Sequence, residues 1–97
     1  MLIVAGTADV DPGNRDTILE ALNEPMRRIR TEPGCLDYVV AADPIEAGRV
    51  NIFERWESAD HLAAHLDAMA RSGQSMPAVH RVEVMRYEVG DAVPVRV

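Results

Sequence analysis

The sequence has few of the residues on which several common kinds of site depend. Its 97 residues include a single cysteine, Cys35, which excludes an intrachain disulfide and any cysteine-pair zinc or redox motif. Aromatic residues make up only 4% of the chain against 47% hydrophobic residues, so the core must be built mainly from aliphatic side chains. The aromatic side chains therefore stand out as candidates for a special role: Tyr38, Phe53, Trp56 and Tyr87.

Lysine is absent, and all ten basic residues are arginines scattered along the chain. Sixteen acidic residues bring the formal net charge to -6. Nucleic acids are bound by clustered basic side chains that neutralise phosphates, so we expect no nucleic-acid partner. Without a basic block we expect no attraction to a membrane surface either. The expected partners are a small molecule and a second copy of the chain.

Long hydrophobic runs are absent as well. The apolar stretch 1–8 has no basic region before it and reaches Asp9 too early for a signal peptide or a membrane span. Together with the single cysteine, this predicts a cytoplasmic protein. A chain of 97 residues has room for one core, so residues 1–97 should form a single domain.

Strand-like and helix-like segments alternate along the first half of the chain. The β-favouring residues 2–8 are followed by turn residues 9–14, of which Asn14 is a candidate helix cap. A helix is expected from Asn14 to about Arg30, because apolar residues recur there at helical spacing: Ile18, Leu19, Leu22, Met26 and Ile29. Pro25 removes one backbone donor and is expected to kink or divide this helix.

The second half continues the alternation. Residues 35–42 and 49–56 are expected to form a hairpin across the turn-rich segment 43–48. Ser58 is the expected cap of a second helix, which ends at Ser72 and Gly73 and places three apolar residues on one face: Leu62, Leu66 and Met69. A loop containing Pro77 leads to a last strand at 82–89.

The element order β-α-β-β-α-β predicts an α+β fold of the ferredoxin-like type. Its four-stranded antiparallel sheet should carry both helices on one face. Strands 2–8 and 35–42 are apolar on both faces, which predicts a homodimer that packs the helix-free faces together. The alternative is a first strand that is central and shielded by the tail. That tail, 90–97, has three alternating valines that suit an edge strand in this sheet or in a partner's sheet: Val93, Val95 and Val97.

Two stretches carry a resemblance to a known family. The segment 31–38 (TEPGCLDY) joins the first helix to the second strand, and 53–58 (FERWES) runs on to Leu62 and His65. With the strand order and the closing VEVMRYEV, the chain resembles the antibiotic biosynthesis monooxygenase family over nearly its whole length. The resemblance implies a dimer with one small pocket per subunit. It also implies, as in several members, oxidation of phenolic or quinol-like substrates by O2 without metal, flavin or another cofactor.

Related haem-degrading enzymes carry an Asn on the first strand, a Trp in the second helix and an axial His further along. Here the first strand has no Asn, His65 fills the Trp position and Ser75 the axial position, while His80 would need a different geometry. The sequence therefore disfavours haem. Some anthrone-oxidising relatives place an Asn where this chain has Ile52, and Asn51 should point to the other face, so the anthrone substrate is in doubt.

Oxidation by O2 without a cofactor requires a base, hydrogen-bond donors for the resulting anion and a dry pocket. Trp56 ends the third strand and offers an indole N–H and a flat surface to an aromatic substrate; its alternative role is packing in the core. His65 could accept the substrate proton as a neutral imidazole; its alternative is a structural histidine between helix and sheet, and the resemblance raises it as a candidate above His61 and His80. His61, one turn earlier on a neighbouring part of the same helix face, could form a pair with His65 and is a further candidate for substrate binding.

Three more residues are candidates for substrate binding. Glu54 shares a face of its strand with Trp56 and should be paired with Arg86 or Arg55, or else act as a base with a raised pKa. Arg86 would support the site from the last strand. Tyr38 and Tyr87 suit either the pocket or the dimer interface, and the pattern leaves that choice open.

Three functions remain open from the sequence. The first is a cofactor-independent monooxygenase acting on a small quinol, anthrone or other electron-rich aromatic, with Trp56 orienting the substrate and His65 handling the proton. The second is an isomerase of a small carbonyl compound, which would use His65 without O2. The third is a non-catalytic dimeric module that binds a small molecule, in which Trp56 and His65 only pack.

Overall fold

The computed structural model describes residues 1–73 and 79–97. The elements follow the predicted order: β1 (Leu2–Val10), α1 (Arg15–Ile29), β2 (Cys35–Ala42), β3 (Arg49–Trp56), α2 (Ala59–Ser72) and β4 (Val79–Glu88). In the part of the chain that is described, neither helix is long and apolar enough to span a membrane.

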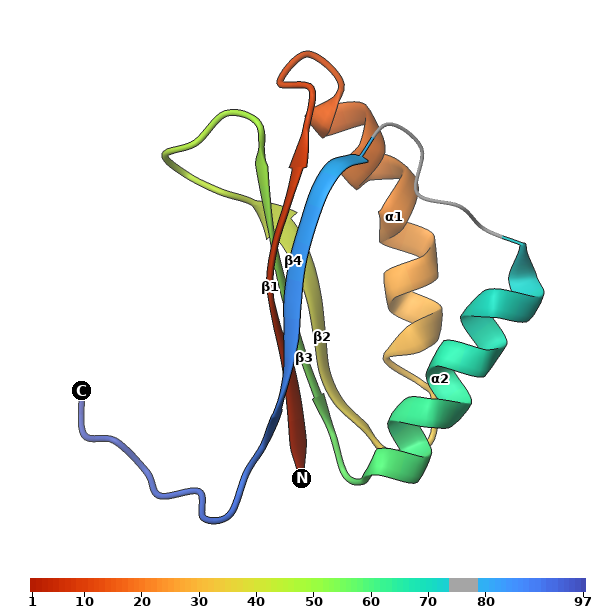
Figure 1. Ribbon diagram of the computed structural model, residues 1–97, viewed down its shortest axis with the longest axis vertical. Coiled ribbons are helices and arrows are strands. Elements are labelled where there is room, and N and C mark those ends of the chain that lie inside the picture. The colour runs from red at the N-terminus through yellow and green to blue at the C-terminus, as the bar shows by residue number, and fades with distance from the viewer. Residues whose placement is uncertain (74–78) are drawn as a thin grey trace.

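The four strands form one antiparallel sheet in the order β2-β3-β1-β4. Both helices lie on the same side of this sheet, and no helix of the described residues lies on the opposite side (Figure 1). This is the predicted α+β fold of the ferredoxin-like type. It places β1 and β3 at the centre, where their residues lie beneath the helices on one face.

Both strands at one end of the sheet are longer than the sequence predicted. Strand β1 continues to Val10 instead of ending near Ala8, and β4 begins at Val79 instead of Val82. The reason is a shift in pairing between Asp9 and Val10, after which Val10 pairs with Val79 and the ladder continues. An irregularity of this kind depends on the partner strand and leaves no mark in the local sequence.

Helix α1 buries the apolar stripe that its spacing predicted. Ile29 is buried in the core, and the other four apolar residues of the stripe pack against it. Of the two outcomes expected at Pro25, division of the helix is wrong, because one helix runs through it from Arg15 to Ile29. Packing of the stripe on both sides of Pro25 compensates for the missing backbone donor. Asn14 occupies the N-cap position, but its side chain makes no capping hydrogen bond.

Helix α2 begins where it was predicted to begin. The Ser58 hydroxyl accepts a hydrogen bond from the backbone N–H of His61, and Gly73 ends the helix with a φ of 69°. The predicted apolar face is wrong at one position: Leu66 is 57% exposed, whereas His65 is buried beside Leu62. The face of α2 that packs on the core therefore consists of Leu62, His65 and Met69, which are three and seven positions apart, and a histidine occupies the place predicted for Leu66.

The core lies between the sheet and the two helices. It consists of buried side chains from all layers: Leu2, Val10, Ile29, Tyr38, Val40, Val50, Trp56 and Leu62. The tail beyond Gly90 is exposed and forms no strand in this chain, so the expected edge strand is not added to its own sheet. In Figure 1 the tail leaves β4 near the N-terminus and extends on the helix-free side of the sheet.

Candidate functional site

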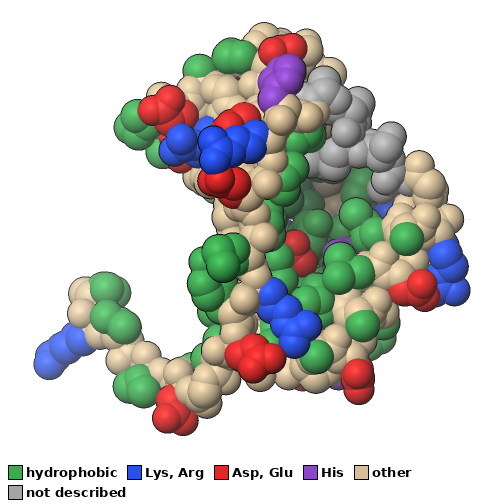
Figure 2. All heavy atoms as spheres, viewed as in Figure 1, with side chains coloured by type: hydrophobic (Ala, Val, Ile, Leu, Met, Phe, Trp, Pro, Cys, Tyr) green, Lys and Arg blue, Asp and Glu red, His purple; other side chains and the backbone are tan. Residues whose placement is uncertain are grey.

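A cavity of about 220 Å³ lies between the sheet and the helices. Most of its walls are apolar: Ala8, Leu22, Pro25, Met26, Ile29, Val40, Ile52, Met69, Val82 and Val84. Two polar side chains, Tyr38 and Glu54, also line it. Figure 2 shows a hollow lined by hydrophobic side chains, with acidic atoms visible inside it. An apolar cavity with a few polar groups is the usual form of a small-molecule site.

The cross-strand register explains why these polar groups meet. Tyr38 of β2 pairs with Glu54 of β3, and Glu54 pairs with Val4 of β1. Directly paired residues project to the same face of a sheet, so this row points toward the helices. Val4 in turn pairs with Arg86 of β4, which places Arg86 on the same face at the outer edge of the row.

Glu54 is the central polar group of the cavity. It is only 8% exposed, and its Oε1 accepts a hydrogen bond of 3.0 Å from the indole N–H of Trp56. Burial raises the pKa of Glu54 above its ordinary value. The bond from Trp56 and the proximity of His65 lower this pKa, while the charge of Glu32 raises it further. A buried carboxyl group with a raised pKa is suited to accept a proton and to return it.

Tyr38 stands beside Glu54 as a neutral donor. Burial and the neighbouring charges of Glu54 and Glu32 raise the pKa of Tyr38 to about 12. The phenol therefore keeps its proton at neutral pH and can donate it in a hydrogen bond to a developing oxyanion. The two tyrosines occupy opposite faces, because Tyr87 pairs with Ile3 in a row that faces away from the helices.

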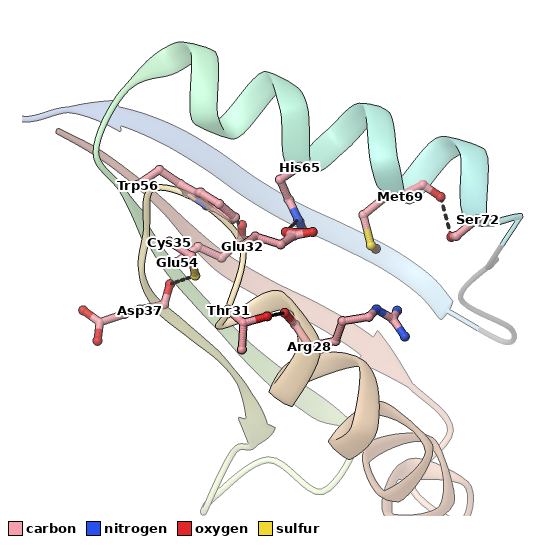
Figure 3. A network of polar contacts seen from close by, with 10 residues as sticks. All are labelled: Arg28, Thr31, Glu32, Cys35, Asp37, Glu54, Trp56, His65, Met69 and Ser72. Carbon is pink, nitrogen blue, oxygen red and sulfur yellow. Dashed lines mark hydrogen bonds and ion pairs between the residues drawn. The ribbon is translucent and has the colours of Figure 1, made fainter.

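His65 lies behind the cavity wall. Its Nδ1 is 2.6 Å from Oε1 of Glu32, a residue of the loop after α1 (Figure 3). The imidazole lies against Trp56 with ring centroids 4.7 Å apart, and meets Tyr38 edge-on at 5.6 Å. His65 and Trp56 are both buried, and neither is among the residues that line the cavity. Both predicted catalytic residues therefore contact the polar end of the cavity from behind.

Two predicted pairings of the site are wrong. Glu54 forms no ion pair with Arg86 or Arg55; its partner is Trp56. Arg55 instead pairs with Asp37, and Arg86 with Glu88 on its own strand. Arg55 is on the opposite face from Glu54, because neighbouring residues of a strand alternate in direction.

His61 and Asn51 are placed away from the cavity. The predicted pair of His61 with His65 does not form, because Nδ1 of His61 lies 2.7 Å from the Ser58 hydroxyl oxygen. The prediction that Asn51 points to the other face is confirmed; its amide nitrogen donates to Asp43 over 2.9 Å. The carboxylate of Asp43 also accepts hydrogen bonds from the backbone N–H groups of Ile45 and Glu46, which fix the turn between β2 and β3. Together these bonds lower the pKa of Asp43 to about 2, chiefly through the N–H of Glu46.

Glu32 is the residue that sequence reasoning missed. It belongs to the TEPGC segment but is 33 positions from His65, so no periodicity connects the two. Helix α1 ends just before it, and Gly34, with a φ of 79°, turns the chain into β2 beneath α2. A side chain added at Gly34 would overlap the ring of His61. The close approach of this loop to α2 is what brings the carboxylate to the imidazole.

The site does not fit a haem. None of the three histidines is among the described residues that line the cavity, and His80 bonds to Asp11 over 2.9 Å at the surface. A volume of about 220 Å³ also falls below the roughly 300–1,000 Å³ of pockets for larger ligands. Ser75, at the position of the axial ligand in haem-degrading relatives, is outside the described residues. Among those described, no three His, Cys, Asp or Glu side chains are arranged to hold a metal.

The geometry defines a small α+β protein with a buried carboxyl group at the end of an apolar cavity. Residues 1–72 match the antibiotic biosynthesis monooxygenase family, and the chain belongs to this family. Family membership supports a function of the monooxygenase type and leaves the substrate open. No curated protein matches the sequence.

Solved structures share the fold. A candidate antibiotic biosynthesis monooxygenase from Deinococcus radiodurans is 24% identical with a TM-score of 0.79, and the match covers 100% of both chains. The haem degrader MhuD from Mycobacterium tuberculosis, with two haems in its active site, is 16% identical over 97% of this chain and 100% of its own, with a TM-score of 0.75. Another candidate monooxygenase, from Chloroflexus aurantiacus, is 28% identical over 96% and 98%, with a TM-score of 0.62.

Proposed function

We propose that the protein is a cofactor-independent monooxygenase that oxidises a small electron-rich aromatic, such as a quinol or naphthol, with O2. The observation that carries the proposal is Glu54, a buried carboxyl group with a raised pKa that lines an apolar cavity beside Tyr38. A base, a neutral donor and a site shielded from water are what such a reaction requires from the protein.

The proposed reaction begins when Glu54 removes a proton from a ring carbon or phenol of the substrate. Tyr38 donates a hydrogen bond to the resulting oxyanion, and the electron-rich carbon forms a bond to O2. The distal oxygen of the peroxide takes the proton back from Glu54. The second hydrogen of the carbon then leaves as a proton while C=O forms and the O–O bond breaks, and the departing hydroxide takes up that proton as water. For a ring CH2 group the balance is CH2 + O2 → C=O + H2O. The substrate loses four electrons, one oxygen atom stays in the product, and the other leaves as water.

The size of the cavity narrows the substrate class. An apolar cavity of about 150 Å³ in a protein core holds one benzene ring. The cavity of about 220 Å³ found here therefore suits one or two fused rings. Three-ring anthrones would require it to widen, which agrees with the doubt raised by Ile52. We propose that Arg86, which pairs with Glu88 at the edge of the Glu54 row, attracts an anionic form of the substrate.

For His65 and Trp56 we propose roles that differ from those expected from the sequence. Trp56 keeps its N–H on Glu54, so we propose that it positions the base and does not bind the oxyanion itself. His65 supports Trp56 and Tyr38 through ring contacts. His61 lies outside the cavity and has no role in this proposal.

The test is O2 uptake by metal-free protein with a panel of quinols, naphthols and anthrones. We expect uptake with one- and two-ring substrates, and its loss in Glu54→Gln, which keeps the acceptor for Trp56 but cannot accept a proton. Glu57→Gln is the matched control, because Glu57 is exposed directly after β3 and does not line the cavity.

Other outcomes would change the assignment. Turnover of a carbonyl compound without O2, lost in Glu54→Gln, would identify an isomerase that uses the same carboxyl group. Stabilisation by an aromatic ligand without any turnover would identify a binding module. Uptake that survives in Glu54→Gln would refute the role proposed for this residue.

We also propose that the protein is a homodimer formed by the helix-free faces of two sheets. This face carries an apolar patch from all four strands: Ile3, Ala5, Val39, Phe53, Met85 and Tyr87. Phe53 is 39% exposed and Met85 62% exposed, which is a large apolar surface to leave in water. The tail extends on the same side, and we propose that its valines pair with the partner subunit (Figure 1).

The dimer is tested by sedimentation at micromolar concentration. We expect a dimer for the full chain, a monomer for Met85→Asp, and a weakened dimer after removal of residues 91–97. Glu83→Ala, on the same face and strand outside the apolar patch, is the control and should stay dimeric. A monomeric full chain would refute the proposal. The cytoplasmic location stays a prediction from the sequence.

A further inference from the structure

We propose that Glu32 is a positioning residue of the site: it holds the imidazole of His65 in one tautomer and so keeps the indole N–H of Trp56 on Glu54. Only the expected effect of Glu32 on turnover rests on the proposed function. The structural part concerns four side chains from three places in the chain, the loop after α1, strand β3 and helix α2 (Figure 3).

The first step is the bond between Glu32 and His65. A carboxylate has only acceptors, so at 2.6 Å the shared proton must be carried by Nδ1 of the imidazole. The side chain of His65 is 3% exposed and that of Glu32 is 25% exposed. Glu32 therefore reaches the buried ring from the outer side of the molecule and fixes both its tautomer and its plane.

The second step is the contact of that ring with the polar end of the cavity. The imidazole lies at 30° to the indole of Trp56, with a centroid distance of 4.7 Å, and it meets the ring of Tyr38 at 64°. Trp56 has no exposed surface, so the face covered by His65 is part of what keeps the indole in place. Rotation of the imidazole would release packing on both aromatic residues that flank Glu54.

The third step is the bond from Trp56 to Glu54. The indole N–H is donor only, and its single bond of 3.0 Å goes to the carboxyl group that lines the cavity. A small displacement of the indole would lengthen this bond and misplace the base. Misplacement of a reacting group by about 1 Å can reduce a rate on the order of 100-fold. Glu32 thus acts on the base through two intermediate side chains and touches no substrate.

Two resonances report on this arrangement without any turnover. Nitrogen NMR of His65 distinguishes a proton on Nδ1 from a proton on Nε2. The indole N–H signal belongs to Trp56 alone, because the chain has one tryptophan. We expect Glu32→Ala to move the His65 proton toward Nε2 and to shift the indole signal toward its value in water. Glu32→Gln should restore both signals, because its amide oxygen accepts from Nδ1 as the carboxylate does.

Turnover gives the second readout. With an active substrate, Glu32→Ala should lower kcat on the order of 10- to 100-fold with little change in KM, because the cavity walls are unchanged. Glu32→Gln should recover most of kcat. Glu20→Gln, which removes an exposed carboxylate from α1, is the control and should match the wild type in all readouts.

The outcomes separate this inference from the proposed function. An unchanged His65 tautomer or an unchanged indole signal in Glu32→Ala would overturn the positioning role, whatever the protein catalyses. Altered NMR signals in Glu32→Ala together with an unchanged kcat would overturn the proposed effect of Glu32 on the base, Glu54. If no substrate of the panel is turned over, the proposed monooxygenase fails, and the two NMR signals still decide whether Glu32 positions His65 and Trp56.

Discussion

Replacement of Glu54 by glutamine should stabilise the protein while it abolishes turnover. Glu54 is buried against an apolar cavity, and burial raises the pKa of its carboxyl group above the ordinary value of 4.5. The native state therefore binds this proton more tightly than the unfolded chain does. Stability is highest below the unfolded pKa and falls as the pH rises through the folded pKa, where the buried group must ionise.

The size of the effect follows from this linkage. Each unit by which the folded pKa exceeds the unfolded one costs about 1.4 kcal/mol of stability at a pH above both. For a domain of this size, about 1 kcal/mol corresponds to a Tm change of roughly 4–8 °C. Glutamine keeps an oxygen that accepts from Trp56 and carries no charge, so Glu54→Gln avoids this cost. We therefore expect Glu54→Gln to have a higher Tm than the wild type at pH 8.

The assay is thermal unfolding followed by circular dichroism between pH 4 and pH 8. The Tm difference between Glu54→Gln and the wild type should grow as the pH rises, since only the wild type has a buried group to ionise. Glu57→Gln, which removes an exposed charge directly after β3, should show no such trend. A Tm difference between Glu54→Gln and the wild type that does not change with pH, or that shrinks as the pH rises, would refute the reasoning.

Further predictions concern the supports of the site. Trp56→Phe removes the donor to Glu54 and should cost about 1.5–3 kcal/mol in chemical denaturation, with the pKa of Glu54 rising further; unchanged stability would contradict the bond. Gly6→Ala should destabilise by about 1–3 kcal/mol or more, because the added carbon overlaps the backbone carbonyl of Glu83; a fully stable variant would disprove this contact between β1 and β4. Ser58→Ala should lose about 0.5–2 kcal/mol through the missing cap of α2, and equal Tm values would argue against the cap.

Local sequence features determined the elements and their order. The stripe on α1, the serine cap of α2 and the two strands at 35–42 and 49–56 were predictable because each depends on neighbours within a few positions. The fold class followed from their order, and the family from short motifs around Gly34 and Trp56. The bounds of β1 and β4 were less accurate, because pairing with another strand sets where a ladder ends.

The partners within the site were decided by tertiary structure alone. The sequence placed Glu54 and Trp56 on one face of their strand but predicted an arginine partner for the carboxyl group. That partner is wrong, because in the folded sheet Arg55 faces away and Arg86 lies two strands from Glu54. It singled out His65 but not Glu32, because the bond between them joins a loop to a helix 33 positions later. Spacing along the chain fixes which face a side chain occupies, whereas contact across layers depends on how helices and loops pack over the sheet.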